Sequence, residues 1–331
     1  MSKIRIGHIG TYHDHSIGKL ECIRKYPDIF EVVGVTAESE KRKQEIAHIP
    51  AYRGLDFVSE EALFEKYKPD AVLIEGYELA LLDIAERCVR RGVHIHMDKP
   101  AGDGLHKFES ILNMAKEKNL IFQMAYMYRY NNAVRKCMEL YKAGKLGELT
   151  GIDAYMCTEH SGEKNKWLEN FKGGIMFFLG CHMLDLVYLF AGKPNNLCMF
   201  NKSTGLSGTR SEDNCFAALE YDKFTAAVRM NSTEVNGYGR RQLVVAGSLG
   251  TVEIKPLENP TKMYVSYKSM TKENIYSDIR EEYVLSPQLG RYDEMMLDFA
   301  AFVRGERKNP YSYEYELGLQ KLVLQACGIE K

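Results

Sequence analysis

The amino-acid sequence predicts an α/β protein of two domains, the first built on a parallel sheet and the second on an antiparallel or mixed sheet. Up to about residue 124, short apolar runs alternate with segments of helical length, the order that produces βαβ units and a parallel sheet. Beyond it, alternating strand-like segments follow one another with few helices between them. A chain of 331 residues is long enough for two cores, so we expect domains over residues 1–124 and 125–331.

In the first domain, the strand candidates are short runs rich in Val, Ile and Leu, as expected for strands buried on both faces of a sheet. They cover residues 4–9, 32–35, 71–74, 93–96 and 120–123. The segments between them show helical spacing of apolar residues. These predicted helices cover residues 18–26, 59–67, 79–91 and 104–118.

In the second domain, the strand candidates alternate apolar and polar residues and are separated by short connections. They cover residues 149–157, 215–221, 224–231, 242–246, 251–254 and 263–267. The predicted helices cover residues 132–143, 174–190, 293–304 and 313–326. A long loop is expected between the strand that ends at residue 157 and the helix that begins at residue 174.

The composition excludes several classes of partner. The 44 Lys and Arg residues nearly balance the 45 Asp and Glu residues, and no basic stripe is present, so neither nucleic acid nor an anionic membrane is expected to bind. Residues 174–192 are apolar but contain His182 and Asp185, which favours a buried helix over a membrane span. Eight cysteines without a Cys-x-x-Cys pair and a start without a secretory signal indicate a cytoplasmic protein.

Residues 7–16 occupy the first strand–helix turn, where a dinucleotide-binding domain has its glycine-rich loop. Gly10 takes the first glycine position, whereas Tyr12 and His15 take the second and third. A bulky residue at the second position crowds a pyrophosphate unless the loop is rearranged. Glu38 follows the second strand and is the candidate acceptor for the adenosine ribose, which favours NAD over NADP; the alternative is an exposed glutamate at a helix start.

His13 and His15 have the spacing of a metal-ligand pair, but a pair without a third ligand is insufficient. We therefore expect these histidines to line the cofactor loop or to cap the following helix. No metal site is predicted.

Lys99 follows an apolar run and precedes Pro100, which ends strand pairing. Its amine is therefore expected at the carboxyl edge of a strand, where open α/β sheets bind ligands. The alternative is a solvated loop cation. Farther along the chain, His182 and Asp185 share one face of an apolar helix, where they either serve chemistry or satisfy internal hydrogen bonds.

Several short segments follow one another in a particular order and spacing along the chain: Asp98-Lys99-Pro100, Tyr128-Arg129-Tyr130-Asn131, residues 144–148, residues 180–185, residues 212–214 and residues 247–251. In this order and spacing they resemble the Gfo/Idh/MocA family of oxidoreductases over nearly the whole chain. The resemblance implies an N-terminal Rossmann domain for NAD(P). It also implies a C-terminal α/β domain whose large, open, mostly antiparallel sheet builds the substrate pocket and the interface of a homodimer or homotetramer.

The resemblance further implies that Lys99 and His182 serve the oxidation of a substrate. His182 is expected to be the acid or base and Lys99 the group that orients and polarises the substrate oxygen, and the reverse assignment is also open. Asp185 is expected to orient His182. The further substrate candidates are Tyr128, Arg129 and Trp167, the last of which either stacks on a sugar or packs in a hinge. The residues expected at the cofactor are Gly10, Thr11, Tyr12, His13, Glu38, Glu75, Gly76, Asp98, Lys99 and Pro100.

This chain departs from the family pattern at three places: the glycine loop, residues 75–78 in place of a Thr-Pro-Asn-like segment, and Phe178 in place of a carboxylate. Three functions follow. The leading one is an NAD-dependent oxidoreductase acting on a sugar, polyol or related hydroxy compound. The second is an enzyme that uses bound NAD transiently for elimination, epimerisation or glycoside cleavage. The third is a non-catalytic ligand sensor on the same fold.

Overall fold

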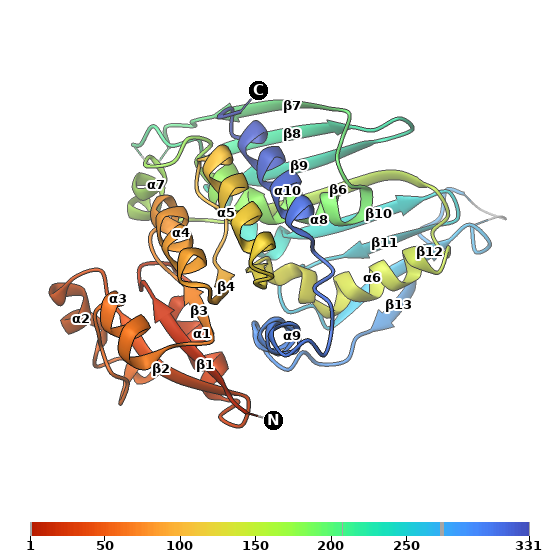
Figure 1. The fold of residues 1–331 in the computed structure, drawn as a ribbon. Helices are drawn as coiled ribbons and strands as arrows, with labels where there is room; N and C mark the ends of the chain where they lie inside the picture. Colours follow the sequence, from red (N-terminus) through yellow and green to blue (C-terminus); the bar gives the residue numbers. More distant parts are fainter. Residues whose placement is uncertain (1, 207, 272–274, 331) are drawn as a thin grey trace. The chain divides into compact units, whose positions relative to one another are not determined.

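The computed structural model describes residues 2–206, 208–271 and 275–330 (Figure 1). Its contacts separate two compact units. Unit 1 holds the residues up to Met127 together with Leu289–Gln320, and unit 2 holds Tyr128–Gln288 together with the residues from Lys321 on. This division differs from two consecutive domains, because a segment near the C-terminal end packs with the N-terminal unit.

Unit 1 is built on a five-stranded sheet in the order β2-β1-β3-β4-β5, in which every neighbouring pair is parallel. The strands are β1 (Ile4–Ile9), β2 (Phe30–Thr36), β3 (Ala71–Ile74), β4 (His94–Met97) and β5 (Phe122–Met124). β3 and β5 are buried at every position, as expected for strands covered on both faces. The predicted Rossmann-like fold of the N-terminal part is confirmed.

The helices of unit 1 connect these strands and cover the sheet. They are α1 (Ser16–Arg24), α2 (Glu40–Ile46), α3 (Glu60–Ala62), α4 (Leu81–Arg91), α5 (Leu105–Glu117) and α9 (Asp293–Val303), with α10 (Tyr313–Ala326) beginning in this unit. The predicted helix 59–67 is a single turn, α3, that continues as the π-helical turn η2 (Leu63–Tyr67). α9 joins unit 1 through Asp293, which accepts a hydrogen bond from the Tyr26 hydroxyl at 2.8 Å.

Unit 2 is built on an eight-stranded sheet in the order β13-β12-β11-β10-β6-β9-β8-β7. Its strands are β6 (Leu149–Cys157), β7 (Asn196–Lys202), β8 (Asn214–Glu220), β9 (Thr225–Asn231), β10 (Gln242–Gly247), β11 (Gly250–Ile254), β12 (Lys262–Tyr267) and β13 (Glu281–Val284). Only the β6–β9 pair is parallel among these described pairs. The predicted large, mostly antiparallel sheet is confirmed.

The helices of unit 2 are α6 (Asn132–Lys142), α7 (Gly162–Leu168) and α8 (Cys181–Ala191), the last preceded by the π-helical turn η5 (Met176–Gly180). The expected long loop after residue 157 is wrong, because α7 forms within it; Ser161 caps this helix by accepting a hydrogen bond from the Lys164 amide. α8 packs on β6 and β9 and is almost entirely buried. None of the helices in the described part of the chain has the length and apolarity that a membrane span requires.

Candidate functional site

The turn after β1 brings the backbone of Gly10 against the end of β3. Gly10 has a φ of 83°, and a Cβ atom added to it would lie 2.5 Å from the Gly76 backbone nitrogen. Only glycine fits a left-handed conformation with so close a backbone approach. The turn therefore requires glycine at position 10, while Tyr12 and His15 take the two later glycine positions.

Glu38, which follows β2, is bound to this turn. Its carboxylate accepts hydrogen bonds from the Thr11 amide at 2.6 Å, the Thr11 hydroxyl at 2.7 Å and the Tyr12 amide at 3.1 Å. The guanidinium of Arg42 donates to the Thr11 carbonyl at 2.7 Å and lies 4.9 Å from the centre of the Tyr12 ring. Tyr12 is 51% exposed, so its ring lies over Arg42 in solvent. Glu38 is exposed and lies directly before Ser39, the N-cap of α2, as the alternative expects, but its carboxylate is also hydrogen-bonded to the β1–α1 turn.

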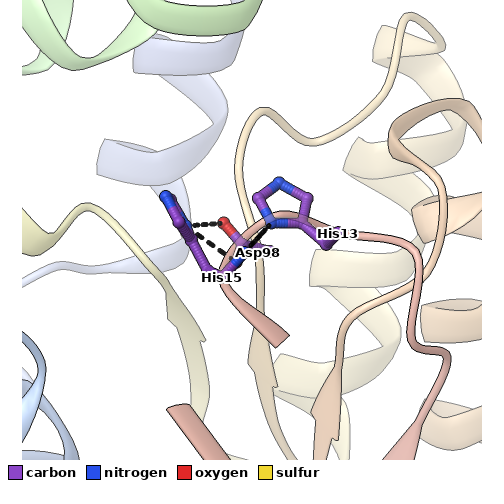
Figure 2. Close-up of side chains that lie close together, drawn as sticks. All are labelled: His13, His15 and Asp98. Carbon is purple, nitrogen blue, oxygen red and sulfur yellow. Dashed lines mark hydrogen bonds and ion pairs between the residues drawn. The ribbon is translucent and has the colours of Figure 1, made fainter. Parts of the chain in front are cut away.

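Below the turn, five ionisable side chains from β1–α1, α1, β3 and β4 meet in the interior of unit 1. Lys19 Nζ donates to Glu75 Oε1 at 2.7 Å and to Asp98 Oδ2 at 2.6 Å. His13 Nδ1 and His15 Nδ1 lie 3.0 and 3.1 Å from the same Asp98 oxygen (Figure 2). Lys19, Glu75 and Asp98 are fully buried. We call these five residues the buried charge cluster.

Burial and mutual charge set the ionisation of this cluster. Burial raises the pKa of Glu75 well above its usual range, and the carboxylate of Asp98 adds to the effect although Lys19 opposes it. Burial also acts against ionisation of Asp98, but His13, Lys19 and His15 outweigh it and hold the pKa of Asp98 well below its usual range. Burial lowers the pKa of His15 to about 3. The cluster therefore favours an ionised Asp98, a protonated Glu75 and a neutral His15.

Lys99 is fully buried and lies at the carboxyl end of β4, next to this cluster. Its amide donates to Asp98 Oδ1 at 2.7 Å, and its carbonyl oxygen lies 3.2 Å from His13 Nε2. The alternative of a solvated loop cation is therefore wrong. Gly76 and Pro100 follow the carboxyl ends of β3 and β4. All ten residues expected at the cofactor lie in unit 1.

In unit 2, His182 lies on α8 and is buried, with the Tyr128 ring edge-on at 4.9 Å between ring centres. Asp185, one turn farther along α8, accepts hydrogen bonds from Arg129 Nε at 2.9 Å and from a terminal Arg129 nitrogen at 2.7 Å. Arg129 and Asp185 therefore form a buried ion pair. The Tyr128 hydroxyl donates to Glu258, a buried carboxylate that the sequence did not single out.

Phe178 and Trp167 pack together in unit 2. Their ring centres lie 4.9 Å apart, and the Lys164 ammonium lies 3.6 Å from the Trp167 ring centre and 4.3 Å from that of Phe178. Where the family pattern has a carboxylate, this chain therefore has an aromatic ring facing a cation. Trp167 also contacts Phe171 edge-on.

Three members of these groups were missed from the sequence. Lys19 is the central cation of the buried charge cluster, Glu258 bonds Tyr128, and Lys164 faces Phe178. Each is a charged residue in a stretch that contains other charged residues, and only the fold turns it inward. A polar residue inside an apolar helical face, as at Lys19 next to Leu20, is the one weak signal that sequence reasoning could have used.

Two family models match this chain over most of its length. Residues 4–126 match an oxidoreductase family with an NAD-binding Rossmann fold, and residues 134–253 match the GFO/IDH/MocA C-terminal domain. The chain belongs to the Gfo/Idh/MocA family of oxidoreductases. The predicted resemblance is thereby confirmed.

Curated relatives in this family include sugar-modifying enzymes. The chain is 27% identical over 132 residues to a UDP-N-acetylglucosamine 3-dehydrogenase of Acidithiobacillus ferrooxidans, which is 40% of this chain and 38% of that protein. It is 25% identical over 133 residues to a dTDP-3,4-didehydro-2,6-dideoxy-alpha-D-glucose 3-reductase of Streptomyces violaceoruber, 40% of this chain and 39% of that protein. These alignments thus span less than half of each relative.

Solved structures match the whole chain in fold. An oxidoreductase of Desulfitobacterium hafniense described as NADPH-dependent has a TM-score of 0.83 at 17% identity, over 100% of this chain and 96% of the other. The UDP-N-acetylglucosamine 3-dehydrogenase of A. ferrooxidans has a TM-score of 0.80 at 19% identity, over 100% and 98%. At these identities the likeness establishes the Gfo/Idh/MocA fold.

The residues of the β1–α1 turn fit the NAD that the Gfo/Idh/MocA family binds. Gly10 provides the close backbone turn, and the Glu38 carboxylate lies beside it, where the hydroxyls of an adenosine ribose can donate hydrogen bonds. Tyr12, which would crowd a pyrophosphate from within the turn, lies over Arg42 instead. The missing second glycine is therefore compensated by the outward position of one side chain.

Proposed function

We propose that this protein is an NAD-dependent oxidoreductase that transfers hydride between the nicotinamide and a hydroxyl-bearing carbon of a sugar, polyol or related hydroxy compound. The observation that carries the proposal is the complete burial of Lys99 at the carboxyl end of β4, in the Rossmann unit of a Gfo/Idh/MocA chain. The named activities of two relatives, a sugar-nucleotide dehydrogenase and a deoxysugar reductase, support the substrate class.

The proposal assigns cofactor selection to Glu38. A carboxylate at the adenosine ribose accepts hydrogen bonds from the two ribose hydroxyls and repels a 2′-phosphate, so NAD is favoured over NADP. Bound NAD supplies the hydride acceptor. The outward position of Tyr12 against Arg42 leaves the turn open to the pyrophosphate.

The catalytic roles fall to Lys99 and His182. During oxidation the carbinol carbon loses a hydride, its hydroxyl loses a proton, and a carbonyl group forms. Lys99 orients the substrate oxygen and stabilises the negative charge that develops on it. His182 takes the hydroxyl proton on its imidazole, because imidazole exchanges protons near neutral pH. The buried ion pair between Arg129 and Asp185 ties α8 to the turn at residues 127–130.

A second function is favoured by one observation. Glu75 and Glu78, which stand where the family has a Thr-Pro-Asn-like segment, are buried, and the pKa of Glu75 is raised well above its usual range by burial. A buried carboxylic acid beside the cofactor turn suits an enzyme that oxidises its substrate transiently and then eliminates a group or epimerises a centre. Turnover without net NADH formation distinguishes this function from simple dehydrogenation.

The test is calorimetric titration of the protein with NAD, NADH and NADPH, followed by a screen of sugars and polyols for NADH formation. We expect NAD(H) to bind at least about tenfold more tightly than NADPH.

Lys99→Met and His182→Asn are each expected to lower kcat by about 10²- to 10⁴-fold. Lys118→Met and His106→Asn change exposed side chains of the same types and are expected to leave kcat unchanged. Absence of binding to all three nucleotides would overturn the proposal in favour of a sensor.

A further inference from the structure

A second constellation of unit 1 is not used by the proposed reaction. His13 and His15, from the turn before α1, and Asp98, from the end of β4, each offer a ligand atom, and these three atoms lie within 4.8 Å of one another (Figure 2). His13 Nδ1 and His15 Nδ1 lie 3.0 and 3.1 Å from Asp98 Oδ2. The structure thus adds to the histidine pair the third ligand that the sequence alone lacks.

The hydrogen bonds of His13 indicate what its Nδ1 atom can do. Nε2 lies 3.2 Å from the Lys99 carbonyl oxygen, which accepts only, so Nε2 carries a proton and donates it. The His15 amide donates to His13 Nδ1 at 3.2 Å, which requires a lone pair on Nδ1. In this tautomer the Nδ1 lone pair lies 3.0 Å from Asp98 Oδ2, and a cation bound between the two atoms would take that lone pair over from the His15 amide.

The contacts around the three residues are those that hold metal ligands in place. A metal-binding histidine commonly donates its other ring N–H to a backbone carbonyl, and a metal-binding carboxylate is itself hydrogen-bonded. Both contacts come from Lys99: its carbonyl oxygen accepts from His13 Nε2, and its amide donates to Asp98 Oδ1 at 2.7 Å. Asp98 Oδ2 is thereby turned toward the two imidazoles.

Lys19 already donates a hydrogen bond to the carboxylate of Asp98, so this bond has to be compatible with a bound ion. Its ammonium donates to Asp98 Oδ2 at 2.6 Å and to Glu75 Oε1 at 2.7 Å. A carboxylate oxygen has two lone pairs, so one accepts from Lys19 while the other remains for an ion. The hydrogen bond of the same ammonium to Glu75 keeps Lys19 in place beside the ion.

We propose that His13, His15 and Asp98 bind one divalent transition-metal ion, with zinc as the metal that best fits two imidazole nitrogens and one carboxylate oxygen. Tetrahedral zinc with ligands at about 2.1 Å places neighbouring ligand atoms about 3.4 Å apart, a few tenths of an ångström beyond the distances to Asp98 Oδ2. The ion links the β1–α1 turn to the end of β4. Three protein ligands leave its fourth position open.

The experiment uses the 331-residue chain, freed of metal by a chelator and titrated with Co²⁺ while the visible spectrum is recorded. We expect one equivalent to produce the absorption bands of tetrahedral cobalt and one equivalent of Zn²⁺ to abolish them. His15→Ala is expected to weaken Co²⁺ binding by at least about 100-fold. His96→Gln replaces a buried histidine of β4 that is hydrogen-bonded to Gln123 and not to the cluster. This variant is expected to bind Co²⁺ like the wild type.

A third variant keeps the result independent of folding defects. His15→Cys retains a ligand and is expected to bind Co²⁺ with an added thiolate-to-cobalt charge-transfer band. Absence of cobalt bands in the wild type overturns the proposal and leaves the contact between His13 and Asp98 as part of the buried charge cluster. Equal Co²⁺ affinity in the wild type, His15→Ala and His15→Cys also overturns it, because the metal is then adventitious. Neither outcome depends on cofactor binding or turnover, so the proposed function stands or falls separately.

Discussion

Glu75 is fully buried beside the carboxyl group of Asp98, and Lys19 donates a hydrogen bond to each. Burial raises the pKa of Glu75 in the folded protein above the value of about 4.3 expected in the unfolded chain. A raised folded pKa gives stability that is present below the unfolded pKa and is lost as the pH rises toward the folded one. Ionisation of Glu75 therefore opposes folding at neutral and alkaline pH.

Glu75→Gln keeps an oxygen that accepts from Lys19 but cannot ionise. We expect its melting temperature, relative to the wild type, to be higher at about pH 8.5 than at about pH 4.5, which lies near the unfolded pKa. Differential scanning calorimetry at the two pH values measures this difference. Glu61→Gln changes an exposed side chain and serves as the control with no pH-dependent difference. An equal shift of Glu75→Gln at both pH values would contradict the assignment.

The ion pair between Arg129 and Asp185 is buried on both sides, with side chains 0% and 1% exposed. Removing one partner leaves the other charge buried without compensation, so Arg129→Met is expected to lower the free energy of unfolding by about 3–5 kcal/mol. The double variant Arg129→Met/Asp185→Leu is expected to recover part of this loss. Urea denaturation of the single and double variants measures both effects.

A surface pair provides the comparison. Lys223 and Glu148 form an ion pair at 2.9 Å, but their side chains are 72% and 73% exposed. Lys223→Met is therefore expected to cost less than about 1 kcal/mol. A loss for Arg129→Met as small as that for Lys223→Met would show that Asp185 is solvated or neutral in the folded protein.

At single positions, the sequence predicts which residues gather at a strand end but not how they pair. Lys99, Asp98 and Glu75 follow strands, so their common edge follows from the topology of a parallel sheet. Lys19 lies on α1, and whether its side chain points into unit 1 depends on the angle at which α1 packs. The pairing of Asp185 with Arg129 likewise depends on packing within unit 2.

Among the elements, the β1–α1 turn depends on glycine at one position, Gly10. Gly10 and Gly54 both have left-handed backbones, with φ of 83° and 76°, but a Cβ on Gly54 would meet no atom within 4 Å. Gly54→Ala therefore pays only the backbone cost of about 1–2 kcal/mol. Gly10→Ala also forces a Cβ against the Gly76 backbone, so it is expected to lose clearly more stability in urea denaturation. Equal losses would mean that the turn can open.

Elements with a buried apolar pattern were predicted well. β1, β3, β6 and α10 have the predicted bounds. β1 and β3 are short apolar runs buried at nearly every position, whereas burial alternates along most of β6. β7 and β13 were missed. They are the two edge strands of the unit 2 sheet, and β13 is exposed at every position while β7 is mostly exposed. An edge strand without a buried face carries no alternating apolar signal, and only pairing with its neighbour defines it.

At the scale of the whole molecule, the chain returns to unit 1 after building the sheet of unit 2, and this return is not visible in the local sequence pattern. α9 fills part of unit 1: Phe299 is buried and contacts His96 of β4, and the Gln123 side chain of β5 donates to the Met295 carbonyl. The N-terminal sheet therefore depends on residues more than 160 positions away. A division of the chain into two consecutive domains near residue 124 assigns α9 to the second domain, although its side chains belong to the core of unit 1.

We therefore expect a fragment of residues 1–127 to lack a cooperative unfolding transition, because Phe299, Met295 and Met296 are missing from its core. A chain that joins residues 1–127 to 289–320 through a flexible Gly/Ser linker restores these side chains and is expected to unfold cooperatively in urea. Asp293→Ala in that chain removes the acceptor of the Tyr26 hydroxyl and is expected to lower its stability by about 1–3 kcal/mol. Cooperative unfolding of the 1–127 fragment with the stability of the joined chain would show that α9 only decorates unit 1.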